Sequence, residues 1–340
     1  MTATTQSAHS APHRSAPAAW LRRGEFWVHT GTGTTRCASY VRWEAPGTET
    51  GELPVVLVHG GGGQSLDWTT TPNGEPGWAP LLVEAGHPVY LPDRPAHGRS
   101  PYRPDVHGDL MPAAAPADVQ RLFAPGPNDS RHRAHTEWPW TRESGSTQFD
   151  ALASAVQPPP RNLANGHRLD GDMLVALLER IGPAVVITHS AGAPAGWIAT
   201  QRRPDLVAAL VAVEPLGPPF RDLGDRGRLA YGLTAVPLDN RSRTDSVDPA
   251  RSQRLLGLAS TPIAVVTADA SGRHDDDLAT VTFLQAAGVR VDHLVLADLG
   301  LPGHGHGLIF ERGHDRTLSI VRDWLSTSIT RHTPPAEGLS

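Results

Sequence analysis

The chain of 340 residues contains no lysine, because all 30 of its basic residues are arginines. This absence excludes a lysine nucleophile and a Schiff base, since both need the lysine amine. The single cysteine, Cys37, excludes an intramolecular disulfide and a metal site built from several cysteines, and it is best interpreted as a small core side chain. A net charge of -5 without a basic stripe indicates that nucleic acid is not a partner.

Long hydrophobic runs are also absent. No stretch approaches the roughly 18 apolar residues of a transmembrane helix, so no membrane association is expected. Residues 1–20 lack the apolar core of a secretory signal, which favours a cytoplasmic location. Polar residues at both ends predict flexible tails at 1–22 and 331–340, around one domain at 23–330.

Glycine and proline are abundant, and they separate short apolar runs from helical patterns. An antiparallel pair of strands is expected first, at 26–30 and 35–42. Further strands are predicted at 53–59, 88–93, 184–188, 206–213, 262–267 and 289–296. Helices are predicted at 77–85, 169–181, 192–202, 276–287 and 316–326. This alternation predicts an α/β fold with a mostly parallel central sheet flanked by helices.

Two stretches interrupt this alternation. Residues 101–160, here called the cap segment, are rich in proline, alanine and histidine and contain several aromatic residues. Residues 216–260 form a second stretch without clear periodicity. Irregular stretches of this length are commonly functional, so both are predicted to be cap or lid insertions.

Ser190 is the candidate nucleophile. It comes two residues after the end of the strand predicted at 184–188, and the small residues Ala191 and Gly192 come next. A sharp turn from a buried strand into a helix exposes a serine hydroxyl, and only small neighbours fit around it. Thr188 departs from the G-x-S-x-G pattern, which has glycine at that position. The alternative interpretation is a serine that only caps the following helix.

A serine hydroxyl needs a histidine base that is oriented by a carboxylate. The late sequence Gly-His-Gly-His-Gly at 303–307 supplies two histidines, of which His306 is preferred and His304 is the runner-up. Glu214 and Asp269 each follow a predicted strand. Glu214 is favoured because Pro215 ends its strand, while Asp269 remains the alternative acid. A histidine pair without a third ligand is a weak metal signal, so no metal is expected.

The glycine run that follows the strand at 53–59 can bring backbone amides close to a reacting oxygen. Gly61 and Gly62, together with the amide of Ala191, are therefore the predicted oxyanion hole. A phosphate-binding loop is the alternative, but the Gly-Lys-Ser/Thr ending is missing. Four aromatic residues are candidates for an apolar substrate pocket, although plain core packing explains each of them equally well: Trp68, Trp138, Trp140 and Phe310.

These motifs together resemble the α/β-hydrolase superfamily. The order of the resembling segments is His59-Gly60-Gly61, then Asp93–Ser100, then Ser190 and finally His306. The segment 93–100 is similar to the D-x-x-G-x-G-x-S turn. Glu214-Pro215 resembles a serine esterase group in which the catalytic glutamate follows the sixth strand, a placement that zearalenone-type lactonases share.

The resemblance implies a serine hydrolase that cleaves a small carboxylic ester through a Ser-His-Glu triad and an acyl-enzyme, without a cofactor. Lactonase, amidase, perhydrolase and lyase activities are alternatives, because a fold does not determine the reaction. A non-catalytic protein that binds a small ligand is the alternative from another class. A homodimer is compatible with the sequence.

Overall fold

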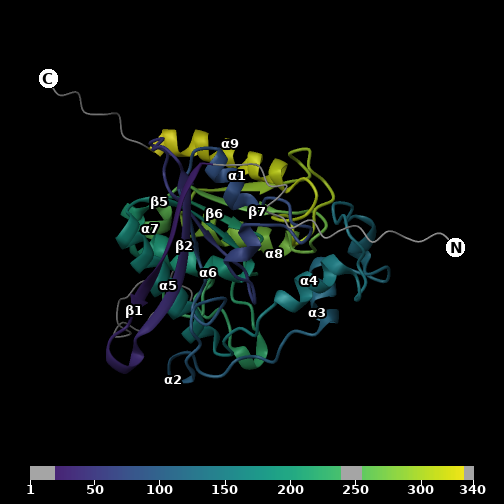
Figure 1. Ribbon diagram of the computed structural model, residues 1–340, viewed down its shortest axis with the longest axis horizontal. Coiled ribbons are helices and arrows are strands. Elements are labelled where there is room, and N and C mark those ends of the chain that lie inside the picture. Colours follow the sequence, from purple (N-terminus) through teal and green to yellow (C-terminus); the bar gives the residue numbers. More distant parts are fainter. Residues whose placement is uncertain (1–19, 239–254, 333–340) are drawn as a thin grey trace.

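A sheet of eight strands runs through the centre of the molecule, with helices on both sides (Figure 1). The structure is a computed structural model that describes residues 20–238 and 255–332. The strands are β1 (Leu21–Thr30), β2 (Cys37–Pro46), β3 (Val55–Val58), β4 (Val89–Pro92), β5 (Ala184–His189), β6 (Val207–Val213), β7 (Ile263–Thr267) and β8 (Val291–Val295).

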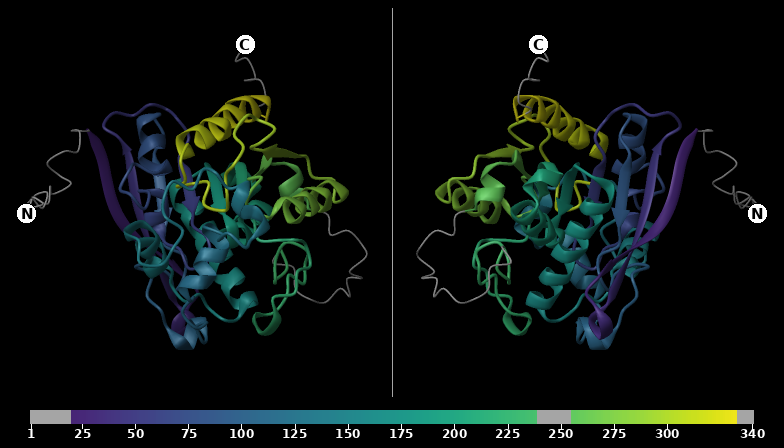
Figure 2. Two further views of the ribbon diagram at one scale, coloured as in Figure 1. Left: turned by 90° about the vertical axis from the view of Figure 1, so that its right-hand side faces the viewer. Right: turned by 90° about the vertical axis from the view of Figure 1, so that its left-hand side faces the viewer.

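The strands follow the order β1-β2-β4-β3-β5-β6-β7-β8. Strand β2 is antiparallel to both β1 and β4, and all pairs from β4 to β8 are parallel. Figure 2 shows β1 and β2 at one side of the molecule and the β7–β8 end of the sheet at the other. The predicted mostly parallel sheet and its antiparallel first pair are confirmed. The carboxyl ends of the parallel strands meet at one edge, where ligands bind in folds of this kind.

The helices are α1 (Trp78–Glu84), α2 (Pro104–His107), α3 (Pro116–Phe123), α4 (Thr147–Ala155), α5 (Leu163–Ile181), α6 (Ala193–Arg202), α7 (Leu256–Ala259), α8 (His274–Ala286) and α9 (His314–His332). Helices α5, α6 and α8 share one hydrophobic core with the sheet, and α1 and α9 share the other (Figure 1).

Strand β3 shows how the sequence produces these two cores. Val56 and Val58 belong to the core under α5 and α6, whereas Val55 and Leu57 belong to the core under α1 and α9. None of the four is exposed to solvent. Successive side chains of a strand point to opposite faces, so a strand that is covered on both sides is apolar at every position.

Helix α5 begins at Leu163, earlier than the predicted start at residue 169. Asn162 caps its first turn, because the side chain of Asn162 accepts a hydrogen bond from the amide of Asn165 at 3.0 Å. The polar first turns of α5 lack the apolar repeat on which the prediction rests, so the cap is the better signal for the start of this helix.

The predicted ends of the domain also need correction. Strand β1 begins at Leu21, inside the predicted tail 1–22, because Leu21 pairs with Pro46 of β2. Helix α9 continues to His332, beyond the predicted domain end at 330. Residues 1–19 and 333–340 lie outside the described residues, so the rest of both predicted tails is untested.

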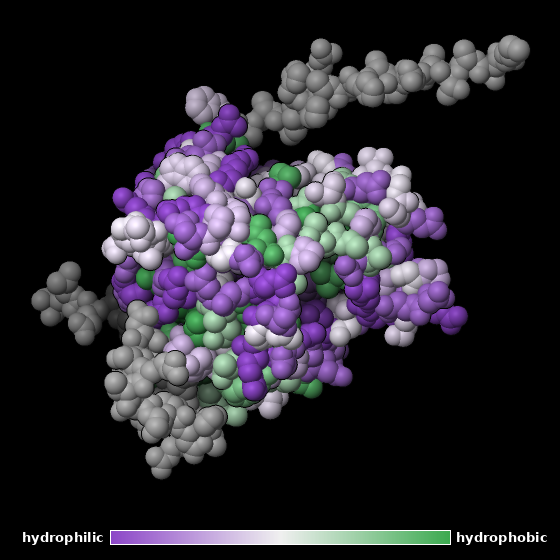
Figure 3. Space-filling view, turned by 90° about the horizontal axis from the view of Figure 1, so that it is seen from below, coloured by the Kyte–Doolittle hydropathy of each residue, from purple (hydrophilic) through white to green (hydrophobic). Residues whose placement is uncertain are grey.

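The cap segment contains three short helices, α2, α3 and α4, joined by turns. In the second predicted insertion the structure describes α7 and the turns up to residue 238, and residues 239–254 lie outside the described part. Figure 3 shows the molecule from below, where patches of hydrophobic and of hydrophilic residues are intermixed on the surface. Whether either insertion acts as a lid remains a prediction.

Candidate active site

Ser190 lies at the sharp turn between β5 and α6. Strand β5 ends at His189, a short 3-10 turn covers Ser190–Gly192, and α6 follows directly. Ser190 has a φ of 52°, in the left-handed region that non-glycine residues rarely adopt. A strained backbone at a half-buried serine is typical of a functional position rather than of an ordinary helix cap.

The small residues around this turn have visible packing reasons. A Cβ on Gly192 would lie 2.5 Å from the carbonyl oxygen of His59, so only glycine fits where α6 begins. Thr188 is accommodated in a different way. A Cβ on Gly196 of α6 would lie 2.9 Å from the methyl group of Thr188. The glycine in the helix therefore makes room for the threonine that stands where the sequence pattern has glycine.

The structure brings Ser190, His306 and Glu214 together. Nε2 of His306 lies 3.0 Å from Oγ of Ser190, and Nδ1 of His306 lies 2.9 Å from Oε2 of Glu214. The carboxylate accepts a hydrogen bond from Nδ1–H, which leaves a lone pair on Nε2 to accept the hydrogen bond from the hydroxyl. Residues from three distant segments thus form one continuous hydrogen-bonded chain.

Glu214 is fully buried directly after β6 and has a φ of 48°. Its other oxygen, Oε1, accepts hydrogen bonds from the amide of Ala268 at 2.8 Å and from Oγ of Ser271 at 2.9 Å. Burial raises the pKa of Glu214 to about 7, although the guanidinium of Arg273, 3.9 Å from Oε2, and these two donors lower it in part. The donors thus orient the carboxylate and offset part of the cost of burying its charge.

The other two candidates do not contact Ser190. Asp269 is exposed, and both of its carboxylate oxygens accept the amide of Gly303, at 2.9 and 3.1 Å. His304 makes its ring contacts with the carbonyl oxygens of Leu301 and Arg312. Both side chains hold the backbone of the loop that carries His306.

Two aromatic rings that sequence reasoning did not assign to the site pack on the ring of His306. Phe123 of α3 stacks on it at 5.5 Å between centroids, and the ring of His189 lies at 4.7 Å. Nε2 of His189 lies 3.0 Å from the carbonyl oxygen of His306 and donates to it. Burial first, and then the charges of Arg273 and Arg131, lower the pKa of His306 well below its usual value, which keeps the imidazole neutral.

The glycine run lies against the serine turn. A Cβ on Gly60 would lie 3.3 Å from Cβ of Ser190, and one on Gly61 would lie 3.3 Å from Cβ of Ala191. Gly62 is turned toward the cap segment, where its carbonyl accepts the amide of Gln157 at 2.7 Å. Among the described residues, no acceptor is recorded for the amides of Gly61 and Gly62. The glycine run thus approaches the serine turn closely, with Gly60 against Ser190 and Gly61 against Ala191.

The four predicted pocket aromatics separate into two groups. Trp68 is fully buried against Trp78 in the core, so its assignment to the pocket is wrong. Phe310 packs on Phe123 at 5.6 Å, and Trp138 packs edge-to-face on Trp140 at 5.0 Å. Trp138 also lies 6.4 Å from Phe310. These three predicted residues form an aromatic cluster that reaches His306 through Phe123.

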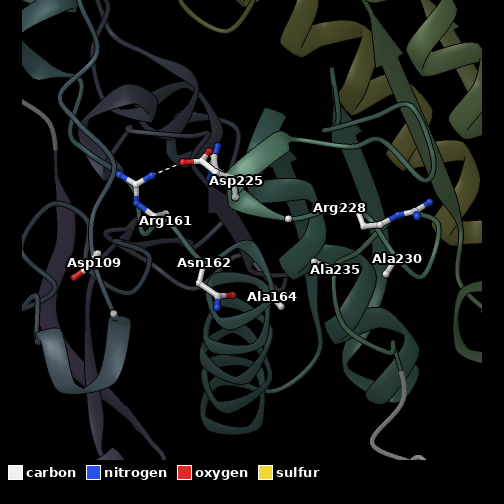
Figure 4. Close-up of a pocket in the computed structure, with 11 residues that line it drawn as sticks. Asp109, Arg161, Asn162, Ala164, Asp225, Arg228, Ala230 and Ala235 are labelled. Atoms are coloured by element: carbon white, nitrogen blue, oxygen red, sulfur yellow. Dashed lines mark hydrogen bonds and ion pairs between the residues drawn. The ribbon is translucent and has the colours of Figure 1, made fainter.

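A cavity of about 630 Å³ lies elsewhere, where the start of α5 meets the turn at 225–235 (Figure 4). Arg161 and Asp225 form an ion pair across it. None of its lining residues belongs to the predicted site. Within the described ranges, no group of three or more histidine, cysteine or acidic side chains is placed to hold a metal ion.

A nucleophile turn between a parallel strand and a helix, with a histidine and a carboxylate supplied by later loops, defines a hydrolase-type site at the carboxyl edge of an α/β sheet. Residues 54–286 match the model of the alpha/beta hydrolase fold family. The chain belongs to this family.

Two known proteins illustrate the relationship. A protein named probable secreted lipase phiG, from Fungal sp. (strain ATCC 74256), is 32% identical over 311 residues, which cover 84% of this chain and 85% of that protein. The structure described as a novel bacterial esterase superposes with a TM-score of 0.69 at 20% identity, covering 92% of this chain and 98% of the other. The chain is thus related to lipase- and esterase-type α/β-hydrolases.

The fungal comparison corrects one expectation. The predicted cytoplasmic location is contradicted, because this relative is named a secreted protein. The prediction rests on residues 1–20, whose polar composition lacks an apolar signal core. In the part of the chain that the structure describes, no helix is both long and apolar enough to span a bilayer.

Proposed function

We propose that the protein is a carboxylic ester hydrolase that works through Ser190, His306 and Glu214. The single observation that carries this proposal is the chain of hydrogen bonds from Ser190 Oγ through the ring of His306 to Glu214, with distances of 3.0 and 2.9 Å. The names of the relatives as a lipase and an esterase support an ester as the substrate. Secretion of the protein is proposed on the name of the fungal relative alone.

The reaction follows from this geometry. Nε2 of His306 takes the proton from Ser190 Oγ as the oxygen attacks the acyl carbon, and Glu214 stabilises the imidazolium that forms. Because Gly61 packs against Ala191 beside the serine, we assign the amides of Gly61 and Ala191 to the oxyanion, with Gly62 as a further donor. His306 then protonates the departing alcohol, and a water molecule, activated by the same ring, releases the acid from the acyl-enzyme. Each step uses groups of the chain itself.

The first test is the variant Ser190→Ala. Its turnover of a p-nitrophenyl ester is expected to fall by roughly 10⁶-fold, because the nucleophile is removed. The thermal unfolding profile should stay close to that of the unmodified protein. A fluorophosphonate probe should label the unmodified protein and not the variant. Turnover that survives in a folded Ser190→Ala variant would exclude the proposed mechanism.

The second test separates the two acids. Glu214→Gln keeps the shape of the side chain but cannot stabilise the imidazolium, so kcat should fall by roughly 10³- to 10⁴-fold. Asp269→Asn alters only a backbone contact of the histidine loop, and its kcat should fall by less than about tenfold. Steady-state kinetics of both variants check this, and a larger loss in Asp269→Asn would reverse the assignment.

A further inference from the structure

His306 lies in a loop without regular structure, so its position depends on contacts with other side chains. Glu311, which is 1% exposed, supplies two of them. Its Oε2 accepts the amide of Gly305 at 2.8 Å, and its Oε1 accepts the amide of Gly307 at 3.1 Å. One carboxylate therefore holds the backbone immediately before and immediately after the histidine.

The glycines on either side of His306 are needed for this contact. A Cβ on Gly305 would lie 2.6 Å from Nε2 of His135 and 3.0 Å from Oε1 of Glu311, and one on Gly307 would lie 2.5 Å from the ring of Phe310 and 2.9 Å from the same oxygen. A larger residue at either position would therefore displace a neighbouring ring and the carboxylate. The Gly-His-Gly pattern at 305–307 thus fits the buried glutamate that follows it.

The cap segment supplies a partner for Glu311. Nε2 of His135 lies 3.1 Å from Oε1 of Glu311, and neither side chain is exposed. Nδ1 of His135 lies 3.0 Å from Nη1 of Arg142, which can only donate, so Nδ1 must be the acceptor. The proton of the neutral ring is therefore on Nε2, on the side of the carboxylate. The contact is electrostatic rather than an aligned hydrogen bond.

The backbone joins the same two segments. The amide of Glu137 donates to the carbonyl oxygen of Gly303 at 2.9 Å, and the amide of Arg312 donates to the carbonyl oxygen of Glu137 at 3.0 Å. The histidine loop is thus connected to the cap segment on both sides of His306. Movement of the cap segment at 135–142 would be transmitted to the loop through these contacts.

We propose that Glu311 is a positioning residue for His306 and that His135 couples it to the cap segment. The inference rests on the proposed function, because it concerns the histidine of that reaction. Glu311 keeps Nε2 of His306 at hydrogen-bond distance from Ser190 by fixing the backbone at 305–307. His135 and Arg142 keep the carboxylate facing the two amides. The contacts made by the cap segment thereby set the geometry of the general base.

The variant Glu311→Gln tests the first part. The amide side chain retains one acceptor oxygen but presents an NH₂ group to the second backbone amide, so the loop loses one contact. We expect kcat for a small p-nitrophenyl ester to fall roughly 10- to 100-fold, with KM changed less than about threefold, because misplacement of a catalytic group lowers the rate of the chemical step. Labelling by a fluorophosphonate should slow by a similar factor, and the melting temperature serves as the check on folding.

The variant His135→Phe tests the coupling. It replaces the imidazole with an aromatic ring that has no nitrogen atoms. Its kcat should also fall. The double variant with Glu311→Gln should lose little more kcat than either single variant, because both changes break the same connection between the cap segment and the histidine loop. The exposed Glu143, on the same segment, provides the control Glu143→Gln, which should leave both constants unchanged.

Three results would overturn the inference: kcat within threefold of the unmodified enzyme in both single variants, losses that multiply in the double variant, or losses that follow only a lowered melting temperature. If Glu311→Gln does not fold, the kcat of His135→Phe alone decides. Failure of the proposed function is distinguished by Ser190→Ala, because that variant would then retain turnover whatever Glu311 does.

Discussion

His97 illustrates how a single buried ring responds to pH. Its Nδ1 donates to the carbonyl oxygen of Pro95 at 3.0 Å, and its Nε2 is buried without a hydrogen-bond partner. Burial first, and then the charge of Arg94, lower the pKa of His97 to about 3. A protonated ring at this position would be a cation without a partner, so the folded protein excludes the proton.

The first stability prediction concerns this ring. An unfolded chain binds a proton at His97 near the ordinary pKa of 6.5, whereas the folded chain does so only near 3. Between these values the unfolded state binds more protons, so stability rises with pH and is fully present above about 6.5. His97→Asn keeps a donor for Pro95 and does not titrate. From about pH 7.5 to about pH 5, the unmodified protein should lose about 2 kcal/mol more unfolding free energy than the variant.

Denaturant unfolding of both proteins at the two pH values measures this difference. The comparison cancels the contributions of other titrating groups, because they are common to both proteins. Equal pH dependence in the two proteins would mean that the ring takes up its proton at the same pH in the folded and the unfolded state, which would contradict the prediction.

The sequence predicts candidate site residues that come just after a strand. It does not predict residues that contact the candidate site only after distant segments have packed together. Ser190 and Glu214 are found because an apolar run ends just before each of them. Phe123 and Glu311 carry no local signal, since their roles depend on which segments become neighbours after folding. The incorrect pocket assignment of Trp68 has the same cause, because a core tryptophan and a pocket tryptophan look alike in sequence.

At the scale of elements, the strands are easier to predict than the starts of helices. Strands β3 and β5 are covered on both sides by helices, so β3 is apolar throughout and β5 is apolar up to Ile187. The start of α5 depends instead on the cap at Asn162, and its first turn is half-polar. The short helices of the cap segment have too few turns to show a periodicity.

The packing of α5 on α6 gives a prediction for a single methyl group. A Cβ on Gly171 of α5 would lie 2.5 Å from Cγ2 of Ile198 in α6. Alanine is the better helix former by about 1 kcal/mol, but the clash in this packed interface should outweigh that gain. Gly171→Ala is therefore expected to lower the free energy of unfolding by about 1 to 2 kcal/mol.

Gly166 in the same helix is the matched control, because a Cβ there would meet nothing within 4 Å. Gly166→Ala should raise the free energy of unfolding by about 0.5 to 1 kcal/mol. Denaturant unfolding of both variants separates helix propensity from packing. Equal effects of the two substitutions would show that the α5–α6 contact does not require glycine.

At the scale of the whole molecule, the environment of His306 is assembled from segments far apart in the chain. The cap segment contributes Phe123 and Arg131, the end of β5 contributes His189, and the start of α8 contributes Arg273. No local sequence pattern reports this combination. The neutral state of the imidazole is thus a property of the complete fold.

This environment predicts the pH dependence of the proposed reaction. His306 acts as a base only when neutral, so the acid limb of kcat/KM that its protonation causes should lie well below pH 6.5. Protonation of Glu214, whose pKa burial raises to about 7, is a separate step at higher pH. Arg131→Gln removes one of the two positive charges that lower this pKa, so its acid limb should lie at higher pH than that of the unmodified enzyme. Rates followed by pH-stat across the acid range measure both limbs, and an acid limb that stays at the same pH in Arg131→Gln would contradict the assignment of His306 as the group whose protonation causes it.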